Sequence, residues 1–310
     1  MTTITASMVK ELREKTGVGM MDCKKALGET EGDMEAAVDW LRKKGLSKAA
    51  KKADRVAAEG LVGVTATANQ GAVVEVNSET DFVARNEQFQ DMVGKITQLA
   101  SSADGDVTKL LATDYPGTSG TVEDHLKETI ATIGENRTVR RAQTLSVENG
   151  VVSAYVHNKV ADGLGKIGVL VALESAADAG KLNEFGRQLA MHVAAAAPLA
   201  LTPEELDQDV IEKERGIYTE QAKASGKPDD IVAKMVEGRL RKEFFQQVVL
   251  LQQTYVLDGK ASIEQAVKTA EKDLGEAVSI KGFVRFALGD GIDKQADDFA
   301  AEVAAAAGTS

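Results

Sequence analysis

Several residue types are scarce in this 310-residue chain, and each shortage excludes a class of protein. A single cysteine, Cys23, rules out a disulfide framework and a cysteine-based zinc cluster. Three widely separated histidines leave little for a histidine-rich metal site. No apolar run reaches the roughly 18 to 20 residues of a membrane span, and the first residues lack the apolar segment of a secretory signal. We therefore expect a cytoplasmic protein that contacts no membrane and binds no metal.

Aromatic residues are also scarce, at 4% of the chain, whereas apolar residues as a whole make up 43%. The cores must therefore be built from Ala, Val, Leu and Ile, which favours helix-rich packing of small side chains. Four prolines and 27% charged residues are typical of a folded globular protein. At roughly 150 residues per domain, the length favours about two domains.

The net charge of −11 argues against a general nucleic-acid binder. The charge is uneven, because residues 1–58 hold twelve basic and nine acidic residues, a net charge of +3. Residues 42–55 hold seven basic residues against one acid, Asp54. A solvated basic linker is the favoured interpretation. The alternative is an electrostatic contact with RNA or with an acidic partner.

The first 56 residues predict three short helices. Apolar residues recur at helical spacing from Met8, and the glycine-containing segment 16–19 interrupts them before a second helix begins at Met20. Asp33 is a candidate cap for a third helix, which is expected to end at Gly45. Such a core is marginal at this size, so we expect a small module tethered by the basic linker.

Residues 57 to 200 predict two similar units, each a β-hairpin followed by a helix. The strands are expected at 61–67 and 72–77, and again at 150–156 and 167–173. A shift of 96 residues places Val73 on Val169 and Phe89 on Phe185 without a gap. We interpret this match as an internal duplication, with chance similarity as the alternative.

The two units differ between the second strand and the helix. The first unit places Phe82 beside Asp81, whereas the second has a polar segment with Asp178 at the position that matches Phe82. A phenylalanine in a loop often packs under that loop. Because the other unit manages with an aspartate, we favour a Phe82 that is offered to a partner.

After residue 200 the pattern becomes helical. Thr202 and Pro203 predict the start of a helix that runs to Ala224, and a second helix is expected over 229–249. Two long helices joined by a tight break form an antiparallel hairpin. This hairpin is expected to project and to pair with a partner or a second copy, with packing against the body as the alternative.

The tail predicts a helix over 263–267, a strand over 280–286 that extends the second sheet, and a last amphipathic helix over 297–304.

No catalytic constellation is recognisable. Residues 163–166 lack the spacing of a phosphate loop, and no histidine lies near Cys23 in sequence to activate its thiol. His192 is expected to be a satisfied core histidine, whereas His157 follows a strand and could contact a partner. We therefore expect neither an enzyme nor a bound cofactor.

The chain nevertheless resembles bacterial elongation factor Ts along essentially its whole length. Residues 10–27, KELREKTGVGMMDCKKAL, look like the N-terminal signature of that family, and Thr80-Asp81-Phe82-Val83 looks like its central motif. Further resemblance lies, in order, at 157, 166–171, 191–195, 225–228, 234–239, 282–286 and 298–303.

The resemblance implies an α+β fold with five parts. These parts are a ubiquitin-associated-like three-helix module with its basic linker at 1–56, a core N-subdomain at 57–141, a core C-subdomain at 142–200 and 246–290, a helical hairpin insertion at 201–245, and a C-terminal module with a helix at 291–310.

The resemblance also implies a guanine-nucleotide exchange factor for elongation factor Tu, with no covalent chemistry of its own. Asp81 and Phe82, flanked by Thr80 and Val83, would wedge between helices of that GTPase near its Mg²⁺ and phosphate site. The other implied contacts are Met20, Met21, Lys24, Ile133 and His157. The hairpin 201–245 can mediate self-association.

Two other functions stay open at this point. A ubiquitin-associated-like adaptor would use only residues 1–56, and an RNA-binding accessory protein would use the basic stretch.

Overall fold

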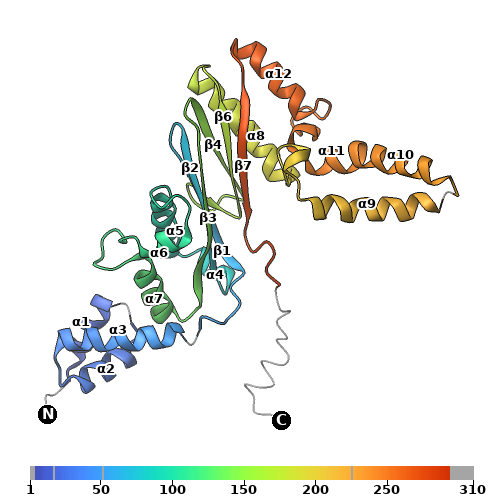
Figure 1. Cartoon of the computed structure of the whole chain (residues 1–310). Coiled ribbons are helices and arrows are strands. Elements are labelled where there is room, and N and C mark those ends of the chain that lie inside the picture. The colour runs from blue at the N-terminus through green and yellow to red at the C-terminus, as the bar shows by residue number, and fades with distance from the viewer. Residues whose placement is uncertain (1–3, 17, 51, 225, 294–310) are drawn as a thin grey trace.

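The computed structural model describes residues 4–16, 18–50, 52–224 and 226–293 (Figure 1). Within those ranges, no helix is both long enough and apolar enough to cross a membrane.

Three helices form a small N-terminal module, as the sequence predicts. They are α1 (Ala6–Thr16), α2 (Met20–Glu29) and α3 (Met34–Ala50). Asp33 caps α3, because its Oδ1 accepts a hydrogen bond from the Ala36 N–H at 2.9 Å. The helices share a buried core of Val9, Leu12, Cys23, Ala26, Leu27, Ala37 and Leu41.

The predicted end of the third helix at Gly45 is wrong, because α3 continues to Ala50. Gly45 lies where α3 packs against α7 (Val122–Ile133), and a Cβ atom added there would lie 2.9 Å from the Cβ of Ala131. This glycine therefore permits a close helix crossing and does not terminate a helix. The first part of the predicted basic linker is helical.

Replacing Gly45 with alanine should force α3 and α7 apart and lower the free energy of unfolding by about 1–3 kcal/mol. Urea unfolding checks this, with Gly94→Ala as the matched control, because nothing lies within 4 Å of the Cβ position of that helical glycine. Combining Gly45→Ala with Ala131→Gly should recover most of the loss. Equal unfolding midpoints for the two single variants would contradict the close crossing.

Two antiparallel sheets form the centre of the molecule (Figure 1). The first sheet has the order β3-β2-β1-β5, with strands β1 (Glu59–Ala66), β2 (Gln70–Ser78), β3 (Arg137–Ser146) and β5 (Leu164–Gly165). The second sheet has the order β4-β6-β7, with strands β4 (Gly150–His157), β6 (Ile167–Glu174) and β7 (Ser279–Ala287). Strand β7 extends the second sheet, as predicted.

Sequence analysis overlooked β3 and β5. Because β3 pairs with β2 through Ser146, residues 142–146 belong to the first sheet, beyond the expected subdomain boundary at 141. The long segment 158–165 also returns to the first sheet, where β5 pairs with Val62 and Gly63 of β1.

The sheets pack face to face, and helices cover their outer faces. The buried residues between the sheets are Val62, Val64, Val73, Val147, Val152, Leu170, Ala172, Val284 and Phe286. The first sheet is covered by α5 (Glu87–Ala100), α6 (Val107–Ala112) and α7, and the second by α8 (Ala179–Ala196) and α12 (Ile263–Leu274). The result is a helix–sheet–sheet–helix arrangement.

The similarity between the two units extends beyond their hairpins. Helices α7 and α12 both begin with a capping box, at Thr121 and Ser262, and both end at a left-handed glycine, Gly134 and Gly275. Each of these pairs is separated by 141 residues, which is 45 more than the shift of 96 between the hairpins. The difference equals the length of the segment 201–245. These features support an internal duplication whose second copy carries an insertion.

The insertion is an antiparallel helical hairpin that projects from the body (Figure 1). Its elements are a 3₁₀ turn (Pro203–Glu205), α9 (Gln208–Lys223), α10 (Asp229–Arg239), a π-helical turn (Leu240–Phe244) and α11 (Phe245–Val248). The predicted helix start at Pro203 is wrong, because Asp207 caps α9 with its side chain while Thr202 makes no capping hydrogen bond. The predicted helix over 297–304 lies outside the described residues.

Candidate functional site

Phe82 protrudes from the one-turn helix α4 (Asp81–Ala84), which joins β2 to α5. Its side chain is 75% exposed, whereas the next residue, Val83, is only 6% exposed. Val83 and Ala84 pack into the core of the first sheet and so anchor the turn. The alternative that Phe82 packs beneath its own loop is therefore wrong.

The segment before α4 is fastened to the α7–β3 turn. The Thr80 hydroxyl donates to the Glu135 carboxylate at 3.0 Å, and the Thr80 N–H donates to it at 3.3 Å. One residue further along in each segment, Glu79 Oε1 accepts from the Asn136 N–H at 2.5 Å. Ile133, the last residue of α7, lies just before this turn and is 41% exposed. Two segments more than 50 residues apart in sequence thus form one surface.

The segment that follows α3 is bound to the same turn. The Asn136 side-chain amide donates to the carbonyls of Ala53 and Arg55, at 3.2 and 2.8 Å. Lys52 donates to the Gly134 carbonyl, and Arg55 pairs with Glu79 at 3.4 Å. The basic stretch is therefore packed against the body here, contrary to the solvated linker that the sequence predicts.

Met20, Met21 and Lys24 lie in α2 of the N-terminal module and are exposed, the two methionines by 53% and 79%. Figure 1 shows α2 well separated from α4. The structure therefore does not bring these three residues together with Phe82, and they form a second exposed patch.

His157 ends β4 and is exposed, with its Nδ1 3.2 Å from the Tyr155 hydroxyl. Its register partner, Ile167, follows Lys166, whose ammonium lies 3.2 Å from the Glu59 carboxylate. Glu59 pairs with Ser78, just before α4. His157 therefore lies at the same end of the paired sheets as Phe82.

The acidic residues at this surface, Glu79, Asp81 and Glu135, are not arranged as a metal site. Among the described residues, no three histidine, cysteine or acidic side chains are placed to hold a metal ion. His192 is fully buried and its Nε2 lies 2.9 Å from Gln253 Oε1, as expected of a core histidine. The surface instead presents the exposed aromatic side chain of Phe82 on an anchored turn.

Sequence reasoning missed three residues that position Phe82, namely Glu79, Glu135 and Asn136. The sequence carries no signal that Glu135 and Asn136 meet residues 79 and 80, because the turn that holds them is recognised only in the structure.

The sequence is similar to known proteins along nearly its whole length. The family model described as elongation factor TS matches residues 79–290, a range that begins just before α4. The chain is 62% identical over 307 residues to elongation factor Ts of Parvibaculum lavamentivorans, with 99% of each chain covered. It is 60% identical over 308 residues to elongation factor Ts of Rhodospirillum centenum, covering 99% of this chain and all of the relative.

Proposed function

The chain belongs to the elongation factor Ts family, and on that basis we propose that it is a nucleotide exchange factor that accelerates GDP release from elongation factor Tu during translation elongation. The observation that carries the proposal is the 75% exposed Phe82 on an anchored one-turn helix. The factor makes and breaks no covalent bond.

The mechanism is a competition between two ligands of the GTPase. Mg²⁺ and the nucleotide phosphates stabilise one arrangement of its switch region, and the factor binds better to the nucleotide-free arrangement. The two effects are thermodynamically linked. Bound nucleotide weakens the binding of the factor by the same free energy by which the bound factor weakens the binding of the nucleotide. Burial of Phe82 is available only in the displaced arrangement. It therefore supplies the differential affinity that a shift of equilibrium requires.

We call Asp81 and Phe82 on α4 the wedge, and Asp81 supplies its polar part. Within the described residues its one ion pair is with Arg85 at 3.5 Å, and both side chains are largely exposed. Exposed pairs of this kind contribute little, on the order of 0–1 kcal/mol. The Asp81 carboxylate can therefore exchange Arg85 for polar groups that are displaced around the Mg²⁺ site.

Pre-organisation of the wedge lowers the entropic cost of binding. Val83 anchors α4 because its side chain is buried, and the Thr80–Glu135 hydrogen bonds hold the residue that precedes α4. Phe82 therefore enters the partner from a turn that is already ordered.

Replacing Glu135 with alanine should slow exchange by up to about tenfold, since lost hydrogen bonds at this turn are worth on the order of 1 kcal/mol. Release of a fluorescent GDP checks this. Glu148→Ala is the matched control, because Glu148 is an exposed glutamate at the opposite end of β3. An unchanged rate in Glu135→Ala would show that the turn does not position the wedge.

The remaining exposed residues extend the proposed interface. Ile133 and His157 flank the wedge, while Met20, Met21 and Lys24 form a separate contact with the GTPase domain. The proposed division of the chain is 1–56, 57–141, 142–200 with 246–290, 201–245 and 291–310. In this division the C-subdomain, 142–200 with 246–290, binds another domain of elongation factor Tu. The hairpin is proposed to support self-association.

The direct test is release of fluorescent GDP from elongation factor Tu with increasing amounts of the full chain. We expect a saturable acceleration. No acceleration at any concentration would overturn the exchange function, and the adaptor function of residues 1–56 would then become the better explanation.

A further inference from the structure

Arg137 is a buried cation that forms no ion pair with any described residue. Its side chain is only 4% exposed, and its buried Nε and Nη2 atoms have no hydrogen-bond partner among residues 4–16, 18–50, 52–224 and 226–293. The guanidinium lies 5.2 Å from the ring centre of Phe89, which offsets only part of its desolvation. Burial lowers the pKa of Arg137, whereas the charge of nearby Glu135 raises it. Glu135 accepts hydrogen bonds from Thr80, and within the described part of the chain no ion pair joins it to Arg137.

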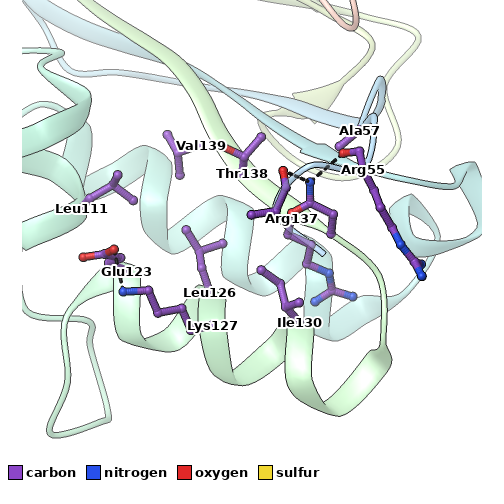
Figure 2. A pocket seen from close by; sticks show the side chains of 12 residues that line it. Arg55, Ala57, Leu111, Glu123, Leu126, Lys127, Ile130, Arg137, Thr138 and Val139 are labelled. Atoms are coloured by element: carbon purple, nitrogen blue, oxygen red, sulfur yellow. Dashed lines mark hydrogen bonds and ion pairs between the residues drawn. The ribbon is translucent and has the colours of Figure 1, made fainter. Parts of the chain in front are cut away.

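Arg137 lines a groove between the segment after α3, helices α6 and α7, and β3 (Figure 2). The groove has a volume of about 670 Å³, which suits a small organic molecule. One wall is apolar and consists of Leu111, Leu126, Ile130 and Val139. Figure 2 shows Arg137 extending from the strand toward Ile130 of α7.

The other charges in the groove are already paired. Lys127 pairs with Glu123 at 2.6 Å, and Arg55 pairs with Glu79 at 3.4 Å. Of the groove's cations, Arg137 is therefore the one that makes no ion pair with a described residue.

A second groove on the other side of α7 is also lined by Arg137, together with Lys95. It carries three acids, Glu87, Asp91 and Glu128, which would repel an anion. The first groove is thus the one whose charge suits an anion.

We propose that the groove of Figure 2 binds a small organic oxyanion, a carboxylate or phosphate on an apolar body, with Arg137 as its counter-ion. The Nε and Nη2 atoms form one edge of the guanidinium, the edge that carboxylates and phosphates engage with two parallel hydrogen bonds. The apolar body lies on Leu126 and Ile130. Both atoms are buried in the free chain, so binding requires the Arg137 side chain to turn toward the groove.

This site is distinct from the proposed contact with elongation factor Tu. It lies beneath the turn that carries Ile133 and Glu135, and it includes Asn136, which ties that turn to the segment after α3. A bound oxyanion would therefore stabilise the junction between the N-terminal module and the body.

The test is thermal unfolding of the full chain with benzoate or phenyl phosphate at constant ionic strength, with uncharged benzamide for comparison. We expect a saturable rise in melting temperature with at least one of the two anions and none with benzamide. A rise with benzoate alone assigns a carboxylate ligand, and a rise with phenyl phosphate alone assigns a phosphate. No saturable rise with either anion would overturn the proposal.

Arg137→Met should fold at least as well as the wild type without ligand, because it removes an uncompensated buried charge. It should lose the anion-dependent rise, whereas Arg187→Met, which replaces an exposed arginine on α8, should keep it. Arg137→Lys keeps the charge without the two-pronged geometry and should bind at least about tenfold more weakly. An undiminished rise in both Arg137 variants would contradict the proposal. Because elongation factor Tu is absent, a negative result leaves the exchange function untouched.

Discussion

Replacing Phe82 with alanine should slow GDP release from elongation factor Tu by about 30-fold or more, which corresponds to about 2 kcal/mol for an aromatic hot spot. The ring is 75% exposed in the free chain, and its burial in the partner is the apolar gain that we assign to the displaced switch region. Truncation removes that gain while leaving α4 anchored by Val83.

The stability of the variant separates a binding defect from a folding defect. Phe82→Ala should unfold at the wild-type urea concentration, because few of its atoms are buried. Val83→Ala should instead lower stability, since that side chain lies in the core. Ile231→Ala, which truncates a 41% exposed residue on the hairpin, is the matched control and should leave exchange unchanged. Wild-type release by Phe82→Ala would remove Phe82 from the mechanism.

Replacing Glu75 with glutamine should lower the free energy of unfolding by about 3 kcal/mol, the scale seen when one partner of a buried ion pair is removed. Glu75 is fully buried in β2, and its carboxylate lies 3.1 Å from Arg140 and 2.6 Å from Arg141. It also accepts from the Asn77 amide at 3.1 Å and the Gly289 N–H at 2.8 Å.

A β-bulge explains how two consecutive arginines reach one carboxylate. Neighbouring residues of a regular strand point to opposite faces. The pairing of β3 with β2 skips Arg140, because Glu75 pairs with Arg141 and Val76 pairs with Val139. The extra residue re-aims the Arg140 side chain. The network also binds the chain beyond β7, because Arg140 donates to the Asp290 carbonyl at 2.5 Å.

The contribution of Glu75 depends on pH. Burial alone raises the pKa of Glu75, but the hydrogen bonds from Gly289 and Asn77 and the charge of Arg141 together hold it below its ordinary value. A carboxyl with a lowered folded-state pKa stabilises the fold above its unfolded pKa of about 4.3. That contribution is lost as the pH falls through the lowered value. The stability difference between the wild type and Glu75→Gln should therefore be largest near neutral pH and shrink below about pH 4.

Urea unfolding at several pH values checks this prediction. Glu264→Gln is the matched control, because Glu264 pairs with Lys268 at 2.7 Å on an exposed helix face. Exposed pairs of this kind contribute about 0–1 kcal/mol, so this substitution should cost little. Equal costs for the two substitutions would show that the buried network does not stabilise the fold.

Sequence patterns predicted the three N-terminal helices and the strands and helices of the two similar units, and comparison of the two units predicted an exposed Phe82. Helices α6 and α7 were missed, although Val122, Leu126 and Ile130 recur at helical spacing in α7. Strand β3 was missed, since its residues RTVRRAQTLS lack an apolar run and are identified only by their pairing with β2. Gly45 was misinterpreted because a helix-ending glycine and a helix-crossing glycine look alike in sequence. Long-range polar contacts had no sequence signal, and the hydrogen bond between Glu75 and Gly289 spans 214 residues.

The most direct test of the central claim is the affinity of the full chain for elongation factor Tu, measured with the GTPase nucleotide-free and then saturated with GDP. The account predicts much tighter binding to the nucleotide-free form. The affinity ratio should equal the factor by which the chain weakens GDP binding, because the two effects are one coupling free energy. Equal affinity for the two forms would contradict the account, since a ligand without differential affinity cannot displace the nucleotide.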